Sequence, residues 1–338
     1  MLQKNLRSCL FVRVVCVVLG FLLVLSPAAA SANQRLVFGE SQWDSQSILN
    51  AIARFVIENG FDGYEVDFST ASSSMNWQSM IIGDVDVEIE VWPDNVPTFA
   101  RDVADGDIIP LGVVVTGGIQ GVYIPRYMIY GCPERDIEPT TPTLRHVADL
   151  TRYAHIFRDP EDPSVGRFFA PIPTWAFSSE IMQNKFSHYN LNDSFNFLRV
   201  GSEAVLFASL MSAYNLGEPW VGFLYEPSWI VGRLDLVMLE DEPFEPELFR
   251  RGATAFPSQD LLIVSSRYFA QKAPDLLDFL NNFNTCINLV NEALAHLEET
   301  GDSHAEIAVW FMRTHDSLLD EWLAPEQAER VRRALAGS

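Results

Sequence analysis

The chain has 338 residues, of which 48% are hydrophobic and 20% are charged. This composition excludes an intrinsically disordered chain and a collagen-like fibre, and four cysteines are too few for a small disulfide-rich scaffold. The formal net charge of −22 argues against a nucleic-acid-binding protein, because phosphate recognition depends on clustered Lys and Arg. At about 100–200 residues per domain, the length predicts two compact units.

Residues 1–32 are typical of a cleaved secretory signal. A basic start precedes the uncharged apolar run 14–25, and the small residues 30–32 supply a cleavage site. The run is well short of the roughly 20 residues that span a bilayer. Neither Cys9 nor Cys16 follows the run as a lipid-attachment cysteine would. We therefore expect a soluble protein of the bacterial periplasm and not a lipoprotein.

Strands and helices alternate along the next part of the chain, which favours an α/β fold. Residues 36–39 and 64–68 have the composition of short strands. Between them, residues 45–58 place apolar side chains at helical spacing, and Gly60 follows as a stop signal.

Hydrophobic and acidic residues alternate strictly along residues 84–91. A period of two is typical of a strand with one buried face, so we expect the acidic face to be solvated. Trp92 follows the acidic face and should point away from the apolar core. A large aromatic residue at a strand end lies where open α/β sheets bind ligands, and ordinary packing at the sheet edge is the alternative. The two faces are Val85, Val87, Ile89 and Val91 on one side and Asp84, Asp86, Glu88 and Glu90 on the other.

Later segments add a crossing strand and a helical end. Glycines interrupt a predicted strand over 112–121, which indicates a bend or a close backbone approach and suits a crossing between two lobes. Residues 173–180 are expected to be a loop that turns into a helix, with a serine pair as its cap. Apolar residues at helical spacing then predict helices over 276–297 and 305–318.

Motifs for catalysis and for cofactor binding are missing from the sequence. It contains no G-x-S-x-G elbow, P-loop, H-E-x-x-H or C-x-x-C, and its glycines lack the G-x-G-x-x-G spacing. The acidic, proline-rich residues 159–163 could hold calcium, but a solvated loop is the simpler interpretation. Cys132 and Cys286 could pair in an oxidising compartment or stay free. We therefore expect a protein that is not an enzyme and needs neither a metal nor a cofactor.

A series of short motifs resembles the glycine betaine/choline substrate-binding proteins of ABC importers, in the order in which they occur in that family. The resemblance covers most of the chain after residue 32. The motifs are Trp43-Asp44, Gly60-x-x-Gly63-Tyr64-Glu65-Val66, Gly83-Asp84-Val85-Asp86-Val87 before Trp92-Pro93, Tyr123-Ile124-Pro125-x-Tyr127, Pro173-x-Trp175, Gly217-Glu218-Pro219, Tyr225-x-Pro227 and Leu234-Asp235-Leu236-Val237-x-Leu239-Glu240.

The resemblance implies an α/β fold of the type II periplasmic binding protein kind. Two α/β lobes joined by a hinge would close over a ligand in the cleft between them. Residues 33–122 with 262–338 would form the first lobe, and residues 123–261 the second. The hinge would lie near 122–125 and near the return strand 261–265.

The same resemblance implies an aromatic box for a quaternary ammonium group. A methylated cation has no N–H donor, so ring faces and apolar contact must replace hydrogen bonds. Trp92, Trp175 and Tyr225 match the three principal box positions. Trp43 and Tyr123 match aromatic residues that join the box in choline-binding members. Since these rings are neutral, we expect the acidity of the chain not to be the recognition element.

Polar contacts to the ligand are also implied by the resemblance. The carboxylate of a betaine would be bound by the backbone N–H groups of Ala176 and Phe177 at a predicted helix N-terminus, which is a natural anion site. Asp44 could accept a hydrogen bond from a choline hydroxyl, or it could cap the helix that begins near Ser45.

The implied function is that of the periplasmic solute-binding component of an ABC transporter. It would capture a quaternary ammonium solute and deliver it, as a monomer, to a membrane permease driven by ATPase subunits. Glycine betaine is the first expectation, with choline, carnitine, proline betaine, dimethylsulfoniopropionate and trimethylamine N-oxide as rivals. The alternatives are a soluble ligand sensor and an extracellular enzyme acting on a small methylated amine.

Overall fold

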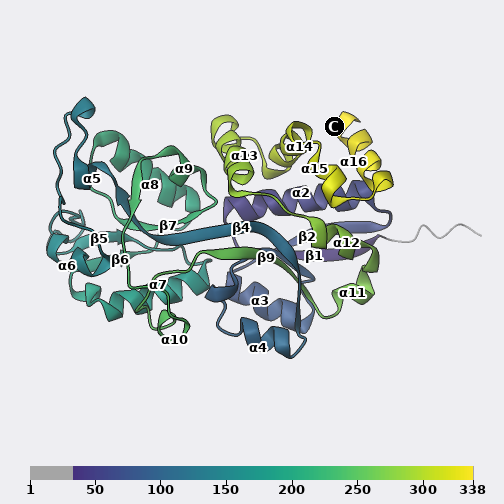
Figure 1. The fold of residues 1–338 in the computed structure, drawn as a ribbon, viewed down its shortest axis with the longest axis horizontal. Coiled ribbons are helices and arrows are strands. Elements are labelled where there is room, and N and C mark those ends of the chain that lie inside the picture. The colour runs from purple at the N-terminus through teal and green to yellow at the C-terminus, as the bar shows by residue number, and fades with distance from the viewer. Residues whose placement is uncertain (1–32, 338) are drawn as a thin grey trace, which may run out of the picture. The chain divides into compact units, whose positions relative to one another are not determined.

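The computed structural model describes residues 33–337, and the strands of this part form one mixed nine-stranded sheet (Figure 1). The strand order is β2-β1-β3-β9-β4-β7-β5-β6, and β8 pairs with β4. The predicted signal segment 1–32 lies outside the described residues. The strands are β1 (Gln34–Glu40), β2 (Tyr64–Thr70), β3 (Val87–Val91), β4 (Ile108–Pro125), β5 (Gly166–Phe169), β6 (Phe195–Leu198), β7 (Gly222–Glu226), β8 (Leu236–Met238) and β9 (Gln259–Ser266).

Helices pack on the sheet and against one another. Helix α2 contacts α13, α14 and α16, so the C-terminal helices cover the outer side of α2 (Figure 1). The helices are α2 (Asp44–Gly60), α3 (Ser73–Ile82), α4 (Phe99–Ala104), α5 (Tyr127–Tyr130), α6 (Leu150–Tyr153), α7 (Ala176–His188), α8 (Glu203–Leu216), α9 (Trp229–Arg233), α10 (Pro246–Phe249), α11 (Phe269–Lys272), α12 (Leu277–Asn282), α13 (Ile287–Thr300), α14 (His304–Thr314), α15 (Leu318–Trp322) and α16 (Pro325–Gly337).

The long strand β4 joins the two halves of the sheet. Its first part pairs with β9 and its last part pairs with β7 and β8, all antiparallel. The predicted glycine-punctuated strand is therefore confirmed. Gly118 shows why a glycine is needed, because a Cβ atom there would lie 2.8 Å from the Leu261 side chain and 3.0 Å from the Trp92 ring. The bare backbone at this point lets the Trp92 ring pack against β4.

The acidic face is buried at Asp86, Glu88 and Glu90 and exposed only at Asp84, so the prediction of a solvated face is wrong for the strand itself. Strand β3 lies inside the sheet between β1 and β9, and helices α2 and α3 lie on opposite sides of this region (Figure 1). The exposed fractions of Asp86, Glu88 and Glu90 are 2%, 3% and 0%. Asp86 is neutralised by Lys272, whose Nζ lies 2.7 Å from its carboxylate. A period of two identifies a strand but does not distinguish a solvated polar face from a buried one.

Helix predictions are confirmed in position and corrected at their ends. The helix expected over 45–58 is α2. The helix expected over 276–297 is divided into α12 and α13. Helix α7 begins at Ala176, earlier than the serine pair, and Trp175 occupies the N-cap position without a side-chain cap. Both Cys132 and Cys286 are free. Within residues 33–337, none of the helices combines the length and the apolar character that a membrane span requires.

Candidate ligand-binding site

A cavity of about 50 Å³ lies where β3, β4 and β7 approach the N-terminus of α7. This volume is several times the roughly 10–15 Å³ that one water molecule needs. The wall combines seven aromatic residues with a smaller set of polar ones. The aromatic residues are Trp43, Trp77, Trp92, Trp175, Phe177, Phe223 and Tyr225, and the polar residues are Ser73, Glu88, Glu90, Asn95, Gln120 and Ser178.

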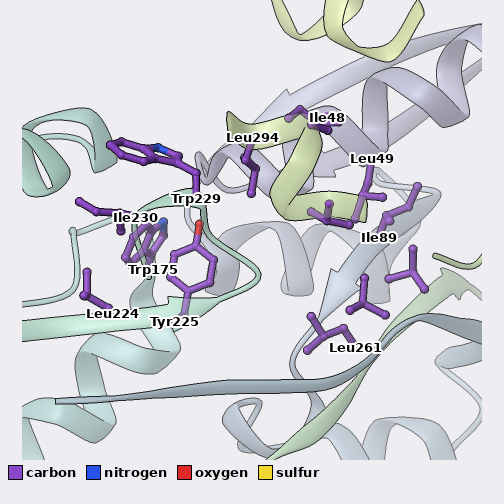
Figure 2. Close-up of a cluster of buried hydrophobic side chains, with 14 of the residues drawn as sticks. Ile48, Leu49, Ile89, Trp175, Leu224, Tyr225, Trp229, Ile230, Leu261 and Leu294 are labelled. Atoms are coloured by element: carbon purple, nitrogen blue, oxygen red, sulfur yellow. The ribbon is translucent and has the colours of Figure 1, made fainter. Parts of the chain in front are cut away.

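The three rings predicted as principal box residues come together at this cavity. The Tyr225 ring lies 6.2 Å from the Trp92 ring and 5.3 Å from the Trp175 ring, at interplanar angles of 87° and 85°. Figure 2 shows Trp175 and Tyr225 beside each other. Because Tyr225 stands edge-on to both indoles, these rings form adjoining walls and not a stack. Such an arrangement can offer more than one ring face to a bound cation.

Trp175 is held in place by a segment that is distant in the sequence. Its indole Nε1 donates to the backbone oxygen of Gln42 at 3.3 Å, and Trp43, which follows Gln42, also lines the cavity. The backbone oxygen of Thr174 accepts from the N–H of Ser73 at 2.9 Å. The segment before α2, the start of α3 and the start of α7 therefore meet at one wall.

The N-terminus of α7 faces this cavity through Phe177 and Ser178. Since Trp175 gives no side-chain cap, the first amides of the helix lack that source of hydrogen bonding. Within residues 33–337, no hydrogen bond is formed by the backbone N–H groups of Ala176 and Phe177. Ala176 itself does not line the cavity. This helix end can accept a negatively charged or polar group.

A polar cluster closes the side of the cavity next to α7. The Asn95 amide donates to Gln120 at 3.2 Å and to Ser178 at 3.1 Å, and the Gln120 amide donates back to Asn95 at 3.1 Å. The Arg250 guanidinium donates to the backbone oxygens of Asn95 and Asp94. These bonds fix the turn that follows Trp92.

Two buried carboxyl groups also line the cavity, and the sequence analysis did not identify them as site residues. Glu90 is fully buried, and burial raises its pKa to about 8. Glu88 is 3% exposed, and burial raises its pKa to about 8 as well. A signal for both was present in the sequence, because Trp92 follows the acidic face of this strand. If Trp92 faces a ligand, its neighbours Glu88 and Glu90 are placed to do so too.

A third buried carboxyl group lies behind the aromatic wall. Glu203 accepts hydrogen bonds from the Tyr225 hydroxyl and, at 2.8 Å, from the backbone N–H of Asp44. Burial, followed by repulsion from Asp44, raises the pKa of Glu203 well above its usual value. Burial and the negative charge of Glu203 also raise the pKa of the Tyr225 hydroxyl, which therefore stays protonated and donates.

Tyr123 and Asp44 are not among the residues that line the cavity. In β4, Gln120 pairs with Tyr225 whereas Tyr123 pairs with Gly222, and three residues of separation place Tyr123 on the sheet face opposite Gln120. The Tyr123 side chain is buried, and its hydroxyl has no partner within the described part of the chain. Burial raises the pKa of this hydroxyl further above its usual value.

Asp44 is the first residue of α2 and does not cap it, so the capping alternative is wrong. Trp43 occupies the N-cap position and makes no side-chain cap. The Asp44 carboxylate instead lies 3.1 Å from Nε2 of His304 on α14. The predicted contacts of Asp44 and Tyr123 with a ligand stay predictions.

Comparison with known proteins identifies the family. Residues 34–314 match the model of the OpuAC family, described as the substrate binding domain of an ABC-type glycine betaine transport system. The chain belongs to this family. The predicted resemblance is confirmed, and the prediction that the protein is not an enzyme is confirmed as well, because OpuAC proteins are solute-binding proteins.

Solved structures with the same fold support the α/β prediction. They include the glycine betaine/L-proline-binding protein ProX of Borrelia burgdorferi, with a TM-score of 0.69 and 17% identity over 88% of this chain and 99% of that one. A choline-binding protein in complex with choline has a TM-score of 0.72 and 15% identity over 89% and 98% of the two chains. Lactococcal OpuAC with glycine betaine has a TM-score of 0.66 and 17% identity over 86% and 100%. The OpuAC fold is that of two-lobed type II periplasmic binding proteins, as predicted.

Proposed function

We propose that this OpuAC protein captures a small methylated ammonium solute in the cavity bounded by Trp92, Trp175 and Tyr225. The observation that carries the proposal is the arrangement of these rings, with Tyr225 perpendicular to both indoles at 6.2 Å and 5.3 Å. A quaternary ammonium spreads its charge over methyl groups that contact ring faces well and need no hydrogen-bond acceptor. The neighbouring Phe223 and Trp43 extend the apolar surface available to those methyl groups.

The polar end of the solute would lie near the start of α7. The backbone N–H groups of Ala176 and Phe177, which form no hydrogen bond within residues 33–337, offer donors there. The candidate solutes all carry a methylated cationic centre, and they are choline, glycine betaine, carnitine, proline betaine, dimethylsulfoniopropionate and trimethylamine N-oxide. A thermal-shift panel of these solutes ranks them, because a ligand that binds only the folded state raises the melting temperature.

Opening of two lobes would give access to the cavity, and their closure would enclose the ligand. The proposed first lobe, 33–122 with 262–338, and the proposed second lobe, 123–261, meet around the site through direct hydrogen bonds. These include Trp175 to the Gln42 backbone at 3.3 Å and Asn95 to Ser178 at 3.1 Å. The ligand-bound, closed form would act as a monomer in the periplasm, exported by the segment 1–32, and would dock on a permease with its ATPase subunits.

Removal of a box ring tests the proposal. In Trp92→Ala and Trp175→Ala, we expect affinity for the best solute of the panel to fall by about a hundredfold or more. This loss corresponds to roughly 3 kcal/mol of cation–ring and apolar contact. Isothermal titration calorimetry measures it, and circular dichroism verifies that the variants are folded.

Trp310→Ala is the matched control. Trp310 stacks on His296 at 4.0 Å and does not line the cavity, so its removal should leave affinity unchanged. Wild-type affinity in both box variants would contradict the aromatic-box proposal. So would an equal loss in all three variants.

A further inference from the structure

Glu90 is a buried acidic residue in the wall of a mainly aromatic cavity. Its side chain is fully buried and lines the cavity together with Trp43, Trp92 and Tyr225. One carboxyl oxygen, Oε1, accepts from the Ser45 hydroxyl at 2.9 Å. The other oxygen, Oε2, is buried without a hydrogen-bond partner within residues 33–337. A buried acceptor without a donor is costly, and the indole N–H of Trp43, whose contact with Glu90 favours the charged form, is also buried without a partner. Oε2 is therefore free to accept from a donor on a ligand.

The backbone brings Glu90 to this position by an irregularity in β3. The pairing of β3 with β9 shifts register between Glu88 and Val91, and Glu90 has φ of +64° within the shift. Positive φ is uncommon for a residue other than glycine and is frequent at functional sites. The bulge therefore presents the Glu90 side chain to the cavity at a local conformational cost.

No basic side chain balances this carboxyl group inside the cavity. The described lining contains no Lys, Arg or His. The other titratable groups at this wall are Glu88 on the same strand and Tyr225 on β7, which line the cavity, and Glu203 and Asp44, whose charges act on Tyr225 together with that of Glu90. None of these groups is basic, so a cationic ligand meets no like charge in the described lining.

The hydrogen-bonding environment of Glu90 supports an ionised form once a cation is present. Burial raises its pKa to about 8, and contacts with Ser45, Trp43 and Trp92 act in the opposite direction because they favour the charged form. A bound cation would lower the pKa of Glu90 further, because it also favours the charged form. A ligand carboxylate placed beside Glu90 would instead introduce a like charge.

We propose that Glu90 is a specificity-determining residue that makes the site favour a net cation, of which choline is the probe, over a zwitterion, of which glycine betaine is the probe. The cationic centre contacts the rings while Glu90 supplies the counter-charge. A hydroxyl group on the cation also gives Oε2 its missing donor. This inference rests on the proposed function, because it names the solute class that the same cavity selects.

Calorimetric titration of the wild-type protein and of Glu90→Gln with choline and with glycine betaine tests the inference. The wild type should bind choline about tenfold or more tightly than glycine betaine. In the variant, choline affinity should fall by about tenfold to a hundredfold, which is the range for one charged hydrogen bond. Glycine betaine affinity should stay the same or increase, so that the preference disappears or reverses. Glu90→Asp keeps the charge and should retain a preference for choline.

Glu226→Gln is the matched control. Glu226 ends β7 next to Tyr225 but does not line the cavity, so the same loss of one charge there should leave the preference unchanged. A wild-type preference for glycine betaine would overturn the inference, as would an equal loss of both affinities in Glu90→Gln. Failure of the wild type to bind either solute would remove the proposed function and this inference with it, whereas binding with an unchanged ratio removes only the inference.

A second measurement covers the case in which Glu90→Gln does not fold. In the wild type, the ratio of choline affinity to glycine betaine affinity should increase from pH 6 to pH 8.5, because Glu90 loses its proton over this range. A ratio that stays constant or decreases would overturn the inference.

Discussion

Glu90 and Glu203 are two buried carboxyl groups next to the same aromatic wall, and they differ in how their oxygens are used. Glu203 receives the Tyr225 hydroxyl on one oxygen and the Asp44 backbone N–H on the other. One oxygen of Glu90 accepts a hydrogen bond from the Ser45 hydroxyl, and the other has no hydrogen-bond partner within residues 33–337. The first group therefore stabilises the wall, and the second is available to a ligand.

The difference shows how a buried carboxyl group with a structural role can be distinguished from one that is available to a ligand. Burial and a raised pKa are common to both groups, so neither property separates them. Hydrogen bonding and position together separate them, because Glu90 lines the cavity with one unpartnered oxygen, whereas Glu203 does not line the cavity and both of its oxygens are bonded. Stability and binding should accordingly respond to different substitutions.

The largest expected effect is on stability when Glu203 is replaced by Met. The Tyr225 hydroxyl and the Asp44 N–H would both lose their acceptor in a buried place. At about 1–3 kcal/mol for each unsatisfied group, the free energy of unfolding should fall by about 2–6 kcal/mol. Urea unfolding monitored by circular dichroism measures the change.

Glu90→Met is the comparison variant for that experiment. It removes a carboxyl group with one unsatisfied oxygen and leaves only the Ser45 hydroxyl without its partner. The free energy of unfolding should fall by less than about 1 kcal/mol, or it should increase. An increase is expected where a buried polar group is kept for function at a cost in stability. Equal losses in the two variants would break the distinction between the two carboxyl groups.

The sequence predicted the rings of the site better than its charges. Trp92, Trp175 and Tyr225 could be found because their motifs lie in the order of the OpuAC family, and they meet at one cavity. Glu88 and Glu90 were assigned to solvent because alternation along one strand cannot reveal what covers its polar face.

The strand pairing determines where Tyr123 lies, and this pairing is not visible in the sequence of a single strand. Gln120 and Tyr225 are cross-strand partners on the cavity side, and Tyr123 lies on the opposite face of β4. The expectation that acidity plays no part in recognition followed from the neutral rings alone. In the structure, the carboxyl groups of Glu88 and Glu90 lie in the same wall as those rings, so that expectation no longer follows from the rings alone.

The pH dependence of stability tests the same two buried carboxyl groups of β3 without any substitution. Burial raises the pKa of Glu88 and of Glu90 to about 8, from a usual value of 4.5. Between these values the folded protein holds protons that the unfolded chain has released. The free energy of unfolding should therefore be greatest below about pH 5 and should fall toward pH 8, by about 1.4 kcal/mol per pH unit for each such proton.

Chemical unfolding of the ligand-free protein at intervals from pH 5 to pH 8 measures this slope. Glu90→Met should have a shallower slope, because one of the contributing protons is gone. Saturating choline should also reduce the slope in the wild type, since a bound cation favours the ionised Glu90 and its stabilisation grows with pH. A slope that is identical in all three samples would show that Glu90 does not titrate in this range.

The smallest expected effects concern the hydroxyl groups of Tyr225 and Tyr123, which differ as the two carboxyl groups do. Tyr225→Phe removes a donor from Glu203 and should cost about 1–3 kcal/mol of unfolding free energy, while the affinity for solute changes by less than about threefold because the ring remains. Tyr123→Phe removes a buried hydroxyl that has no partner in residues 33–337, so stability should be unchanged or increase by up to about 1 kcal/mol.

The two substitutions delete the same atom from neighbouring strands, and a double-mutant series with Glu203→Met separates them further. Coupling should appear for Tyr225 and not for Tyr123, because only the Tyr225 hydroxyl shares a hydrogen bond with that carboxyl group.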